Sequence, residues 1–196
     1  MNDRFGAAFY HRFYRDARTC VASRAETLKL AQLVHAYLRY LDVPVRSILD
    51  AGCGLGYWCD AAATLWPRAR YTGIEVSGYL CDLHGWTRAS IVDYAPKRRF
   101  DLVVCQSVLQ YLDARDAARA IGNLAALARG AVYIEAPTRE DWAQTCDRSR
   151  TDGNVHLRPA EWYRRQLSRH FHAAGGGIFV PKDGKAVLYA LERAES

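Results

Sequence analysis

Residues 48–56, ILDAGCGLG, constrain the fold more than any other stretch of this sequence. An apolar run ends on an acid, Asp50, and glycines then stand at the alternate positions 52, 54 and 56. Three glycines in five residues are costly in backbone entropy, so they indicate a tight turn where the main chain closely approaches a ligand. A strand that passes through such a turn into a helix is typical of nucleotide-binding α/β proteins.

Segments with strand-like and helix-like patterns alternate along most of the chain. Apolar runs predict strands at residues 45–50, 69–76, 89–93, 100–105 and 131–136. Periodicity, caps and breakers predict one helix from the capping box at 23–26 to the VP pair at 43–44, and others over 55–66, 77–83, 113–130 and 158–171. This alternation favours an α/β fold with a doubly wound, mostly parallel sheet.

The C-terminal segment breaks this alternation. Residues 176–192 predict two strands around a turn at Lys182-Asp183-Gly184, so the last strand is expected to run antiparallel to its neighbour. The length of 196 residues suits one domain over 1–196. Within it we expect an N-terminal helical cap segment at 1–42 and an α/β core at 43–196.

Bulk properties bear on compartment and partners. No run of about 18 apolar residues indicates a membrane span, and the stretch MNDRFGAAFYHRF lacks the apolar centre of a secretory signal. The six cysteines form no CxxC pair and have no zinc-ligand spacing, so we expect reduced thiols, no metal site and a cytoplasmic location. The net charge of +6 comes mostly from scattered arginines, which favour a basic surface over a nucleic-acid interface.

The glycine spacing distinguishes between two kinds of ligand. A dinucleotide fingerprint has the spacing G-x-G-x-x-G around a pyrophosphate, whereas this chain has G-x-G-x-G. Asp50 would repel a pyrophosphate but suits an ammonium group, which S-adenosylmethionine carries. Glu75 ends the second predicted strand, where an acid can accept hydrogen bonds from the ribose hydroxyls of either ligand. Asp93 ends the third predicted strand on the same edge and is a candidate acceptor for an adenine amino group.

Four segments together resemble the class I S-adenosylmethionine-dependent methyltransferases: LDAGCGLG, YTGIEVS, SIVDY and FDLVVCQSVLQYL. The resemblance is close over about residues 45–136 and holds in outline elsewhere. It implies a Rossmann-like core with seven strands, the last of them antiparallel. It also implies S-adenosyl-L-methionine as the cofactor and S-adenosyl-L-homocysteine as the product.

The resemblance further implies a role for individual residues. The methionine amino group would lie at Asp50, the ribose at Glu75 and the adenine amino group at Asp93. The turn backbone would follow the methionine, one glutamine would lie near the reacting methyl, and two valines would form apolar walls: Gly52, Cys53, Gly54, Gln106, Val76 and Val92. Only 17 residues, 76–92, separate Glu75 from Asp93, so the helix that covers the adenine in this family is expected to be truncated.

The stretch after the fourth predicted strand bears on the methyl acceptor. Its sequence, CQSVLQYL, lacks the proline motif of nucleic-acid amino methylases and resembles the form common in small-molecule methyltransferases. We therefore expect a small-molecule acceptor and no nucleic-acid or membrane partner. The catalytic candidates are Tyr111, which stands where the family often has histidine, and His156, as a base or substrate contact or merely a loop-packing residue. Residues 9–16 and 151–163 are candidate lids, and further candidates for substrate contact are Tyr10, Tyr14 and Arg158.

Other functions stay open on the sequence alone. The basic charge is compatible with an RNA or protein methyltransferase. The three acids that would bind the cofactor are equally compatible with a module that binds S-adenosylmethionine without catalysis. An NAD enzyme is disfavoured by the glycine spacing.

Overall fold

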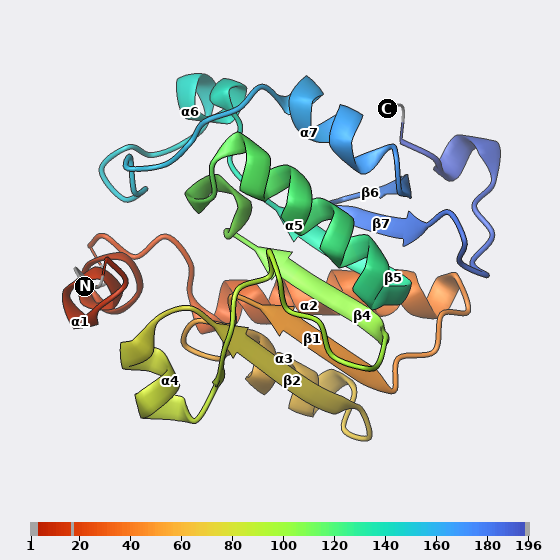
Figure 1. Cartoon of the computed structure of the whole chain (residues 1–196), viewed down its shortest axis with the longest axis horizontal. Coiled ribbons are helices and arrows are strands. Elements are labelled where there is room, and N and C mark those ends of the chain that lie inside the picture. The colour runs from red at the N-terminus through yellow and green to blue at the C-terminus, as the bar shows by residue number, and fades with distance from the viewer. Residues whose placement is uncertain (1–3, 17, 195–196) are drawn as a thin grey trace.

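The computed structural model describes residues 4–16 and 18–194, and the strands within these ranges form one seven-stranded sheet (Figure 1). The order across the sheet is β3-β2-β1-β4-β5-β7-β6, and only β7 runs antiparallel to its neighbours. The predicted doubly wound, mostly parallel sheet is therefore confirmed. The strands are β1 (Ser47–Ala51), β2 (Arg70–Glu75), β3 (Thr87–Arg88), β4 (Phe100–Gln106), β5 (Ala128–Glu135), β6 (Phe171–Gly175) and β7 (Ile178–Pro181).

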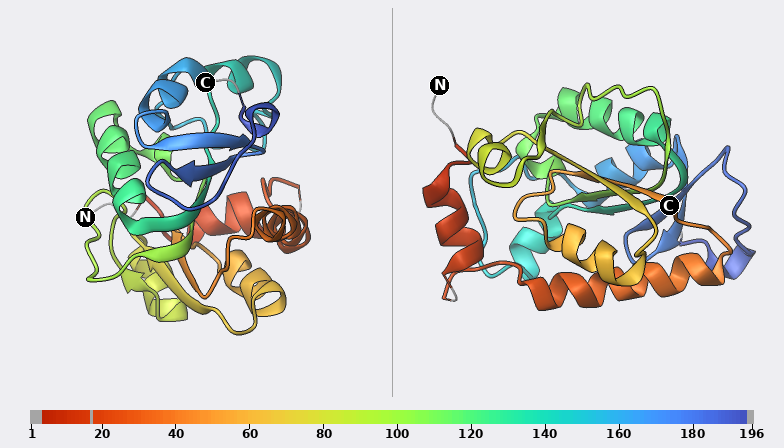
Figure 2. Two further views of the ribbon diagram at one scale, coloured as in Figure 1. Left: turned by 90° about the vertical axis from the view of Figure 1, so that its right-hand side faces the viewer. Right: turned by 90° about the horizontal axis from the view of Figure 1, so that it is seen from below.

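Helices cover both faces of this sheet (Figure 2). The long helices α2 (Arg24–Tyr40) and α3 (Tyr57–Leu65) pack on one face, and α5 (Ala114–Leu127) and α7 (Ala160–Leu167) on the other. The shorter helical elements are α1 (Ala7–Tyr10), the π-helical turn η1 (His11–Arg15), α4 (Gly78–His84), the 3-10 turn η2 (Leu109–Tyr111), α6 (Arg139–Gln144) and the 3-10 turn η3 (Ala190–Glu192). Among the described residues, no helix combines the length and hydrophobicity that crossing a bilayer requires.

The central strand β4 has apolar side chains on both faces of the sheet. Leu102 and Val104 belong to the core under α2 and α3, whereas Val103 and Cys105 belong to the core under α5 and α7. Successive side chains of a strand point to opposite faces, so an unbroken apolar run is what a strand buried on both sides needs.

The carboxyl ends of the parallel strands define one working edge of the molecule. β1, β2, β4 and β5 end along this edge, and α1 with η1 lies beside it (Figures 1 and 2). A hydrogen bond of 2.6 Å from the Ser77 hydroxyl to the Phe5 carbonyl joins this N-terminal segment to the end of β2. Ligands of open α/β sheets bind at such an edge.

The third strand differs from the prediction. The ladder with β2 is only Thr87–Arg88, and residues 89–93 lie outside it. The backbone N–H of Tyr94 donates to the Ser90 carbonyl at 2.9 Å, so the chain turns there and Ile91 packs into the core. An apolar segment that is buried in a turn has the same composition as a short buried strand, which is why the sequence pattern was misleading here.

The C-terminal hairpin also differs from the prediction. Its two strands are β6 and β7, and the turn lies at Gly176 and Gly177 rather than at 182–184. Both glycines have left-handed backbones, with φ of +58° and +78°, and this supplies the tight reversal. The preceding helix is accordingly shorter than predicted and ends at Leu167.

Helix caps were predicted more reliably than helix ends. Ser23 and Glu26 form the expected capping box of α2, and Asp113 caps α5 by accepting from the Asp116 backbone N–H at 2.8 Å. The predicted end of α5 at residue 130 is wrong by three residues: α5 ends at Leu127, and Gly130 lies within β5. A β-carbon at Gly130 would stand 2.4 Å from the Asp101 carbonyl oxygen, so close packing of the chain explains this glycine.

Candidate active site

The three glycines after β1 adopt left-handed backbones, with φ of +80° at Gly52, +51° at Gly54 and +78° at Gly56. A β-carbon at Gly52 would stand 2.4 Å from a Val108 methyl carbon, and one at Gly56 would stand 2.9 Å from Trp86. A β-carbon at Gly54 would meet no protein atom closer than 3.9 Å. The middle glycine therefore faces open space, as it would if its backbone lies against a ligand.

Asp50 lies at the end of β1 with 2% of its surface exposed, and it lines a cavity of about 320 Å³ that we call the Asp50 cavity. The Tyr71 hydroxyl donates a hydrogen bond of 2.5 Å to its carboxylate. Burial raises the pKa of Asp50 to about 7; the hydrogen bond from Tyr71 opposes this shift, and the negative charge of Glu75 adds to it. A ligand ammonium group would therefore relieve an electrostatic cost that the fold imposes on this acid.

Glu75, at the end of β2, is also buried and is held by backbone amides. The N–H groups of Gly54, Val76 and Ser77 donate to its carboxylate at 3.0, 2.8 and 2.9 Å. A carboxylate offers about four acceptor positions. The chain uses three of these, so Glu75 fixes the glycine turn and keeps capacity for one further donor without rearrangement.

A second cavity, of about 140 Å³, lies beside Glu75 and is called the Glu75 cavity. Its lining includes the expected residues Gly52, Gly54, Val76 and Gln106. Its lining also includes aromatic side chains from the N-terminal segment and from η2, which are Phe5, Phe9, Tyr10, Tyr14 and Tyr111. The predicted wall tyrosines are thus brought together here. Phe9 belongs to the candidate lid segment 9–16, whereas Phe5 lies outside that segment and no motif indicated it.

These aromatic rings pack against one another. The Phe9 ring lies 5.1 Å from Phe5, 5.0 Å from Phe13 and 6.2 Å from Tyr111, measured between centroids. We call the described residues 4–16 the aromatic cap, because they place these rings over the Glu75 cavity. Offset and edge-to-face contacts of this kind add about 0.5–1.5 kcal/mol per pair beyond burial.

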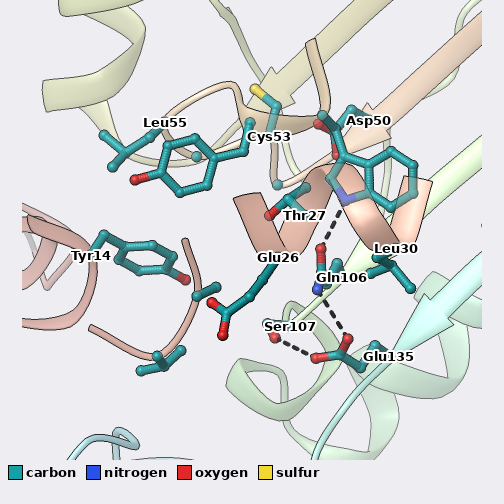
Figure 3. A pocket seen from close by; sticks show the side chains of 16 residues that line it. Tyr14, Glu26, Thr27, Leu30, Asp50, Cys53, Leu55, Gln106, Ser107 and Glu135 are labelled. Carbon is teal, nitrogen blue, oxygen red and sulfur yellow. Dashed lines mark hydrogen bonds between the residues drawn. The ribbon is translucent and has the colours of Figure 1, made fainter. Parts of the chain in front are cut away.

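Gln106 and Glu135 end the neighbouring strands β4 and β5 and are paired in register. Gln106 accepts from the Trp58 indole at 2.8 Å and donates to Glu135 at 2.9 Å, and the Ser107 hydroxyl is 3.3 Å from the same carboxylate (Figure 3). Ser107 has a left-handed φ of +55°, an uncommon backbone conformation for a residue other than glycine. The sequence reasoning missed both Ser107 and Glu135, although an acid that ends a predicted strand was the available signal.

A third cavity, of about 350 Å³, opens between the aromatic cap, η2 and the segment after β5. We call it the Asp152 cavity. Tyr14 and Ser107 line this cavity and both of the others, so these two residues mark the point where the three meet. Burial, followed by the charge of Glu75, raises the pKa of Tyr14 to about 12, so its hydroxyl stays protonated at neutral pH.

Tyr111 lines both the Glu75 cavity and the Asp152 cavity. Burial raises its pKa, and nearby Tyr14 and Asp152 raise it further. A neutral phenol can donate a hydrogen bond to a substrate but cannot take a proton from it. The geometry therefore supports Tyr111 as a contact residue rather than as a base.

Four predicted residues are not brought to these cavities. Asp93 is exposed and lines none of the three, and Val92 packs against the core instead. Ser90 and Ile91 occupy the expected place in the wall of the Glu75 cavity. The spacing of 17 residues between Glu75 and Asp93 indicated a truncated segment, but it did not reveal which residues of the loop line the cavity.

His156 is likewise exposed and lines none of the three cavities. Its backbone N–H donates to the Gln110 carbonyl at 2.8 Å, which holds the segment against η2. Arg158 is buried and donates to carbonyls around η2, so its guanidinium is not presented to a substrate. Among the residues described, no group of three His, Cys, Asp or Glu side chains is arranged to hold a metal ion.

Comparison with known proteins assigns the chain to a family. A family model described as a methyltransferase domain matches residues 22–175. The chain is 31% identical over 85 residues to malonyl-[acyl-carrier protein] O-methyltransferase of Legionella pneumophila, covering 38% of this chain and 30% of that protein. It is 32% identical over 79 residues to trans-aconitate 2-methyltransferase of Rhodopseudomonas palustris, covering 37% and 30%. These matches therefore span less than a third of the curated relatives.

The fold has a counterpart among solved structures. The sugar N-methyltransferase KedS8 from a Streptoalloteichus species superposes with a TM-score of 0.67 at 20% identity, covering 90% of this chain and 93% of that one. The family match over most of the length, together with the fold, shows that this chain belongs to the class I S-adenosylmethionine-dependent methyltransferases.

Proposed function

We propose that this enzyme transfers a methyl group from S-adenosylmethionine to a small molecule that enters the Asp152 cavity. The observation that carries the proposal is the junction at Tyr14 and Ser107, where this cavity meets the two that contain the cofactor-type residues. A methyl donor and its acceptor must meet in line at near-attack distance, which a junction of separate cavities permits.

The residues at hand fit the cofactor. S-adenosylmethionine supplies a methyl group that is electrophilic because it is bonded to a sulfonium centre. Asp50 would hold the ammonium end, and Glu75 would accept from a ribose hydroxyl at its one remaining acceptor position. The backbone at Gly54 would follow the methionine, and Ser90 with Ile91 would contact the adenine in place of Asp93.

Positioning is the main contribution that we assign to the protein. His156 is exposed and lines none of the three cavities, so the proposal does not use it as a base. Tyr14 and Ser107 would orient the acceptor, and the aromatic cap would exclude water from the reacting atoms. Orientation of this kind can lower the activation free energy by about 7–11 kcal/mol, because it turns a bimolecular step into an effectively unimolecular one.

Cofactor binding is tested by calorimetry with S-adenosylmethionine, S-adenosylhomocysteine and NAD. Gly54→Asn is the informative variant, because asparagine tolerates a left-handed backbone while its side chain fills the open space. Gly85→Asn is the matched control, since Gly85 also has a left-handed backbone and open space but lies on the exposed end of α4. We expect only Gly54→Asn to abolish binding. Equal affinity of both variants, or tight binding of NAD by the parent, would contradict the proposal.

The class of acceptor is tested with a donor that carries a labelled methyl group. Bacterial extract is separated into small-molecule, RNA and protein fractions, and each is incubated with the parent enzyme or with Gly54→Asn. We expect enzyme-dependent label in the small-molecule fraction. Label confined to RNA or protein would overturn the small-molecule assignment while leaving methyl transfer intact.

A further inference from the structure

Asp50 accepts its hydrogen bond from a residue that lines none of the three cavities. The Tyr71 hydroxyl donates to Oδ2 of Asp50 at 2.5 Å, and Tyr71 belongs to the neighbouring strand β2. In the parallel ladder Tyr71 pairs with Ile48, and Gly73 pairs with Asp50. Side chains two residues apart on a strand point to the same face, so Tyr71 and Asp50 share one face of the sheet. Tyr71, rather than the glycine opposite Asp50, therefore supplies the polar neighbour on that face.

The second oxygen of Asp50 is left for a ligand. Asp50 lines the Asp50 cavity, and within residues 4–16 and 18–194 its carboxylate accepts a hydrogen bond from Tyr71 alone. Oδ1 is nonetheless not enclosed, because the one enclosed side-chain polar atom without a partner in those ranges is Oε1 of Gln110. The phenol thus occupies one oxygen of the carboxylate, and the other remains reachable from the cavity.

Trp86 packs against Tyr71 and braces the glycine turn. Its ring centroid lies 6.2 Å from that of Tyr71, and its indole N–H donates to the Gly54 carbonyl at 3.0 Å. A β-carbon at Gly56 would stand 2.9 Å from the Trp86 side chain, and one at Gly73 would stand 3.1 Å from it. The indole therefore fills the space that these two glycines leave. Because the turn fixes the indole, the indole in turn limits the positions that the Tyr71 ring can take.

The ionisable groups that act on Asp50 are neutral or acidic. Besides Tyr71, they are Glu75 on β2 and three thiols from the turn, α3 and β4, namely Cys53, Cys59 and Cys105. Burial raises the pKa of all three thiols, so they carry no charge at neutral pH. Among the described residues that line the Asp50 cavity, the other charged side chains are Glu26 and Glu135. None of these groups is a cation that could take the place of a ligand ammonium group.

We propose that Tyr71 is a positioning residue that makes the cofactor site select ligands with an ammonium end. Its hydroxyl holds one oxygen of the Asp50 carboxylate and so presents the other oxygen to the ammonium group. The inference rests on the proposed function, because it concerns how that cofactor site is held. Tyr71 lines none of the cavities and acts on the ligand through Asp50.

The ionisation of Asp50 links this role to pH. Burial raises the pKa of Asp50 to about 7, and the hydrogen bond from Tyr71 opposes that rise. An ammonium group favours the ionised acid, so below about pH 7 binding displaces the proton of Asp50 to the solvent. Without the Tyr71 hydroxyl, burial and the charge of Glu75 act unopposed, and Asp50 ionises at a higher pH.

The test measures the binding of three ligands to the full chain by calorimetry. S-adenosylhomocysteine has an ammonium and a carboxylate group, its decarboxylated derivative keeps only the ammonium group, and methylthioadenosine lacks both. Each is titrated into the parent and into Tyr71→Phe between about pH 6 and pH 7.5, where the ligand amines stay mostly protonated. Tyr37→Phe is the matched control. Tyr37 is also half-buried and donates a hydrogen bond of 3.0 Å to the Ala174 carbonyl, but it lines none of the three cavities.

We expect a loss of affinity that is confined to the two ammonium ligands. At about pH 7, Tyr71→Phe should bind both of them roughly tenfold less tightly than the parent, because a hydrogen bond to a charged group is lost. Its affinity for methylthioadenosine should stay within about twofold. In the parent, the ammonium ligands should bind more tightly as the pH rises through this range, and in Tyr71→Phe the rise should move to a higher pH. Tyr37→Phe should match the parent for all three ligands.

A double-mutant cycle shows whether Tyr71 acts through Asp50. Asp50→Asn should itself lose the preference for ammonium ligands, and the addition of Tyr71→Phe should then weaken binding little further. Additive losses would show that Tyr71 acts elsewhere, which overturns the inference. Tyr71→Met removes the same donor with a side chain that adapts to its surroundings. It should show the same selective loss, and it replaces Tyr71→Phe if that variant does not fold.

Other outcomes would assign Tyr71 to the fold alone. Equal losses for all three ligands, unchanged affinities with a lower melting temperature, or the same pH profile as the parent would each overturn the inference. In those cases, binding of S-adenosylhomocysteine by the parent would still support the proposed function. If the parent binds none of the three ligands, the inference and the proposed function both fail.

Discussion

At the scale of single residues, Asp50 shows how the fold prepares a site. Its pKa of about 7 arises chiefly from burial, whereas an aspartate in an unfolded chain titrates near pH ~3.9. Between these values the folded protein holds a proton on Asp50 that the unfolded chain has released. The free energy of unfolding contributed by Asp50 therefore falls as the pH rises from about 4 to about 7.

Asp50→Asn removes this titration. We expect the ligand-free variant to be more stable than the parent at about pH 8, and to lack the fall in unfolding free energy that Asp50 causes between about pH 4 and pH 7. Its affinity for S-adenosylmethionine should drop by roughly tenfold or more, since the variant lacks the charge that pairs with the ammonium group. Asp42→Asn is the control, because Asp42 is exposed and has a left-handed backbone that asparagine tolerates. Denaturant titrations at several pH values provide the measurement, and parallel curves for parent and Asp50→Asn would argue against a buried, titrating acid.

At the scale of elements, Arg158 joins η2 to the segment before α7. Its buried guanidinium donates to the carbonyls of Leu109 at 3.1 Å, His156 at 3.3 Å and Leu112, and to the Tyr163 hydroxyl at 3.0 Å. No carboxylate pairs with it in the described part of the chain. The backbone carbonyls therefore offset the desolvation of this charge and fix η2, which carries Gln110 and Tyr111.

Arg158→Met should destabilise the protein, because each buried carbonyl left without a donor costs about 1–3 kcal/mol. We expect the free energy of unfolding in denaturant to fall by at least ~2 kcal/mol, while Arg115→Met, on the exposed side of α5, changes little. Equal midpoints for the two variants would show that water satisfies those carbonyls equally well.

The glycine turn between β6 and β7 offers a matched pair of variants. Both Gly176 and Gly177 have left-handed backbones, but a β-carbon at Gly177 would stand 2.8 Å from the Ile134 carbonyl oxygen, whereas one at Gly176 would meet nothing nearer than 3.8 Å. Alanine at Gly176 should cost about 1–2 kcal/mol from backbone strain alone. Gly177→Ala should cost a further 1–3 kcal/mol or so from overpacking against β5. Thermal melts of the two variants measure the difference, and identical melting temperatures would mean that the hairpin shifts freely away from β5.

At the scale of the whole molecule, the aromatic cap closes one side of the Glu75 cavity, which is part of the cofactor site that we propose. Ser77 and the rings around Phe9 attach this segment to the sheet edge. Cofactor in the Glu75 cavity would add contacts to the same rings. If the cofactor binds there, the folded protein as a whole should gain about 2.7 kcal/mol at a ligand concentration of 100 Kd, and the cap should be protected together with the cavity.

We expect S-adenosylhomocysteine to slow amide hydrogen exchange across residues 7–15 more than across the distant hairpin at 171–181. Phe9→Ala should weaken cofactor binding by roughly tenfold, because the half-buried Phe9 ring lines the Glu75 cavity and packs against the neighbouring rings. If exchange slows equally in both segments, the ligand acts on global stability alone and the cap has no specific role.

The sequence by itself determined the framework of the site. The apolar runs placed β1, β2, β4 and β5, and the turn at 52–56 with Asp50 and Glu75 followed from their positions at strand ends. Such features are local, because a strand end or a left-handed glycine depends on neighbours within a few residues. The family was therefore recognisable before any packing was known.

Only the tertiary structure decided which distant residues share a cavity. Tyr14, Gln110 and Glu135 meet because separate segments pack at one sheet edge, and nothing in the local pattern encodes that meeting. Asp93 and His156 carried suitable chemistry but are exposed and line none of the three cavities. The direction in which a side chain points depends on the packing of the whole chain. In a loop, which has neither strand nor helix periodicity, the local sequence pattern does not determine that direction.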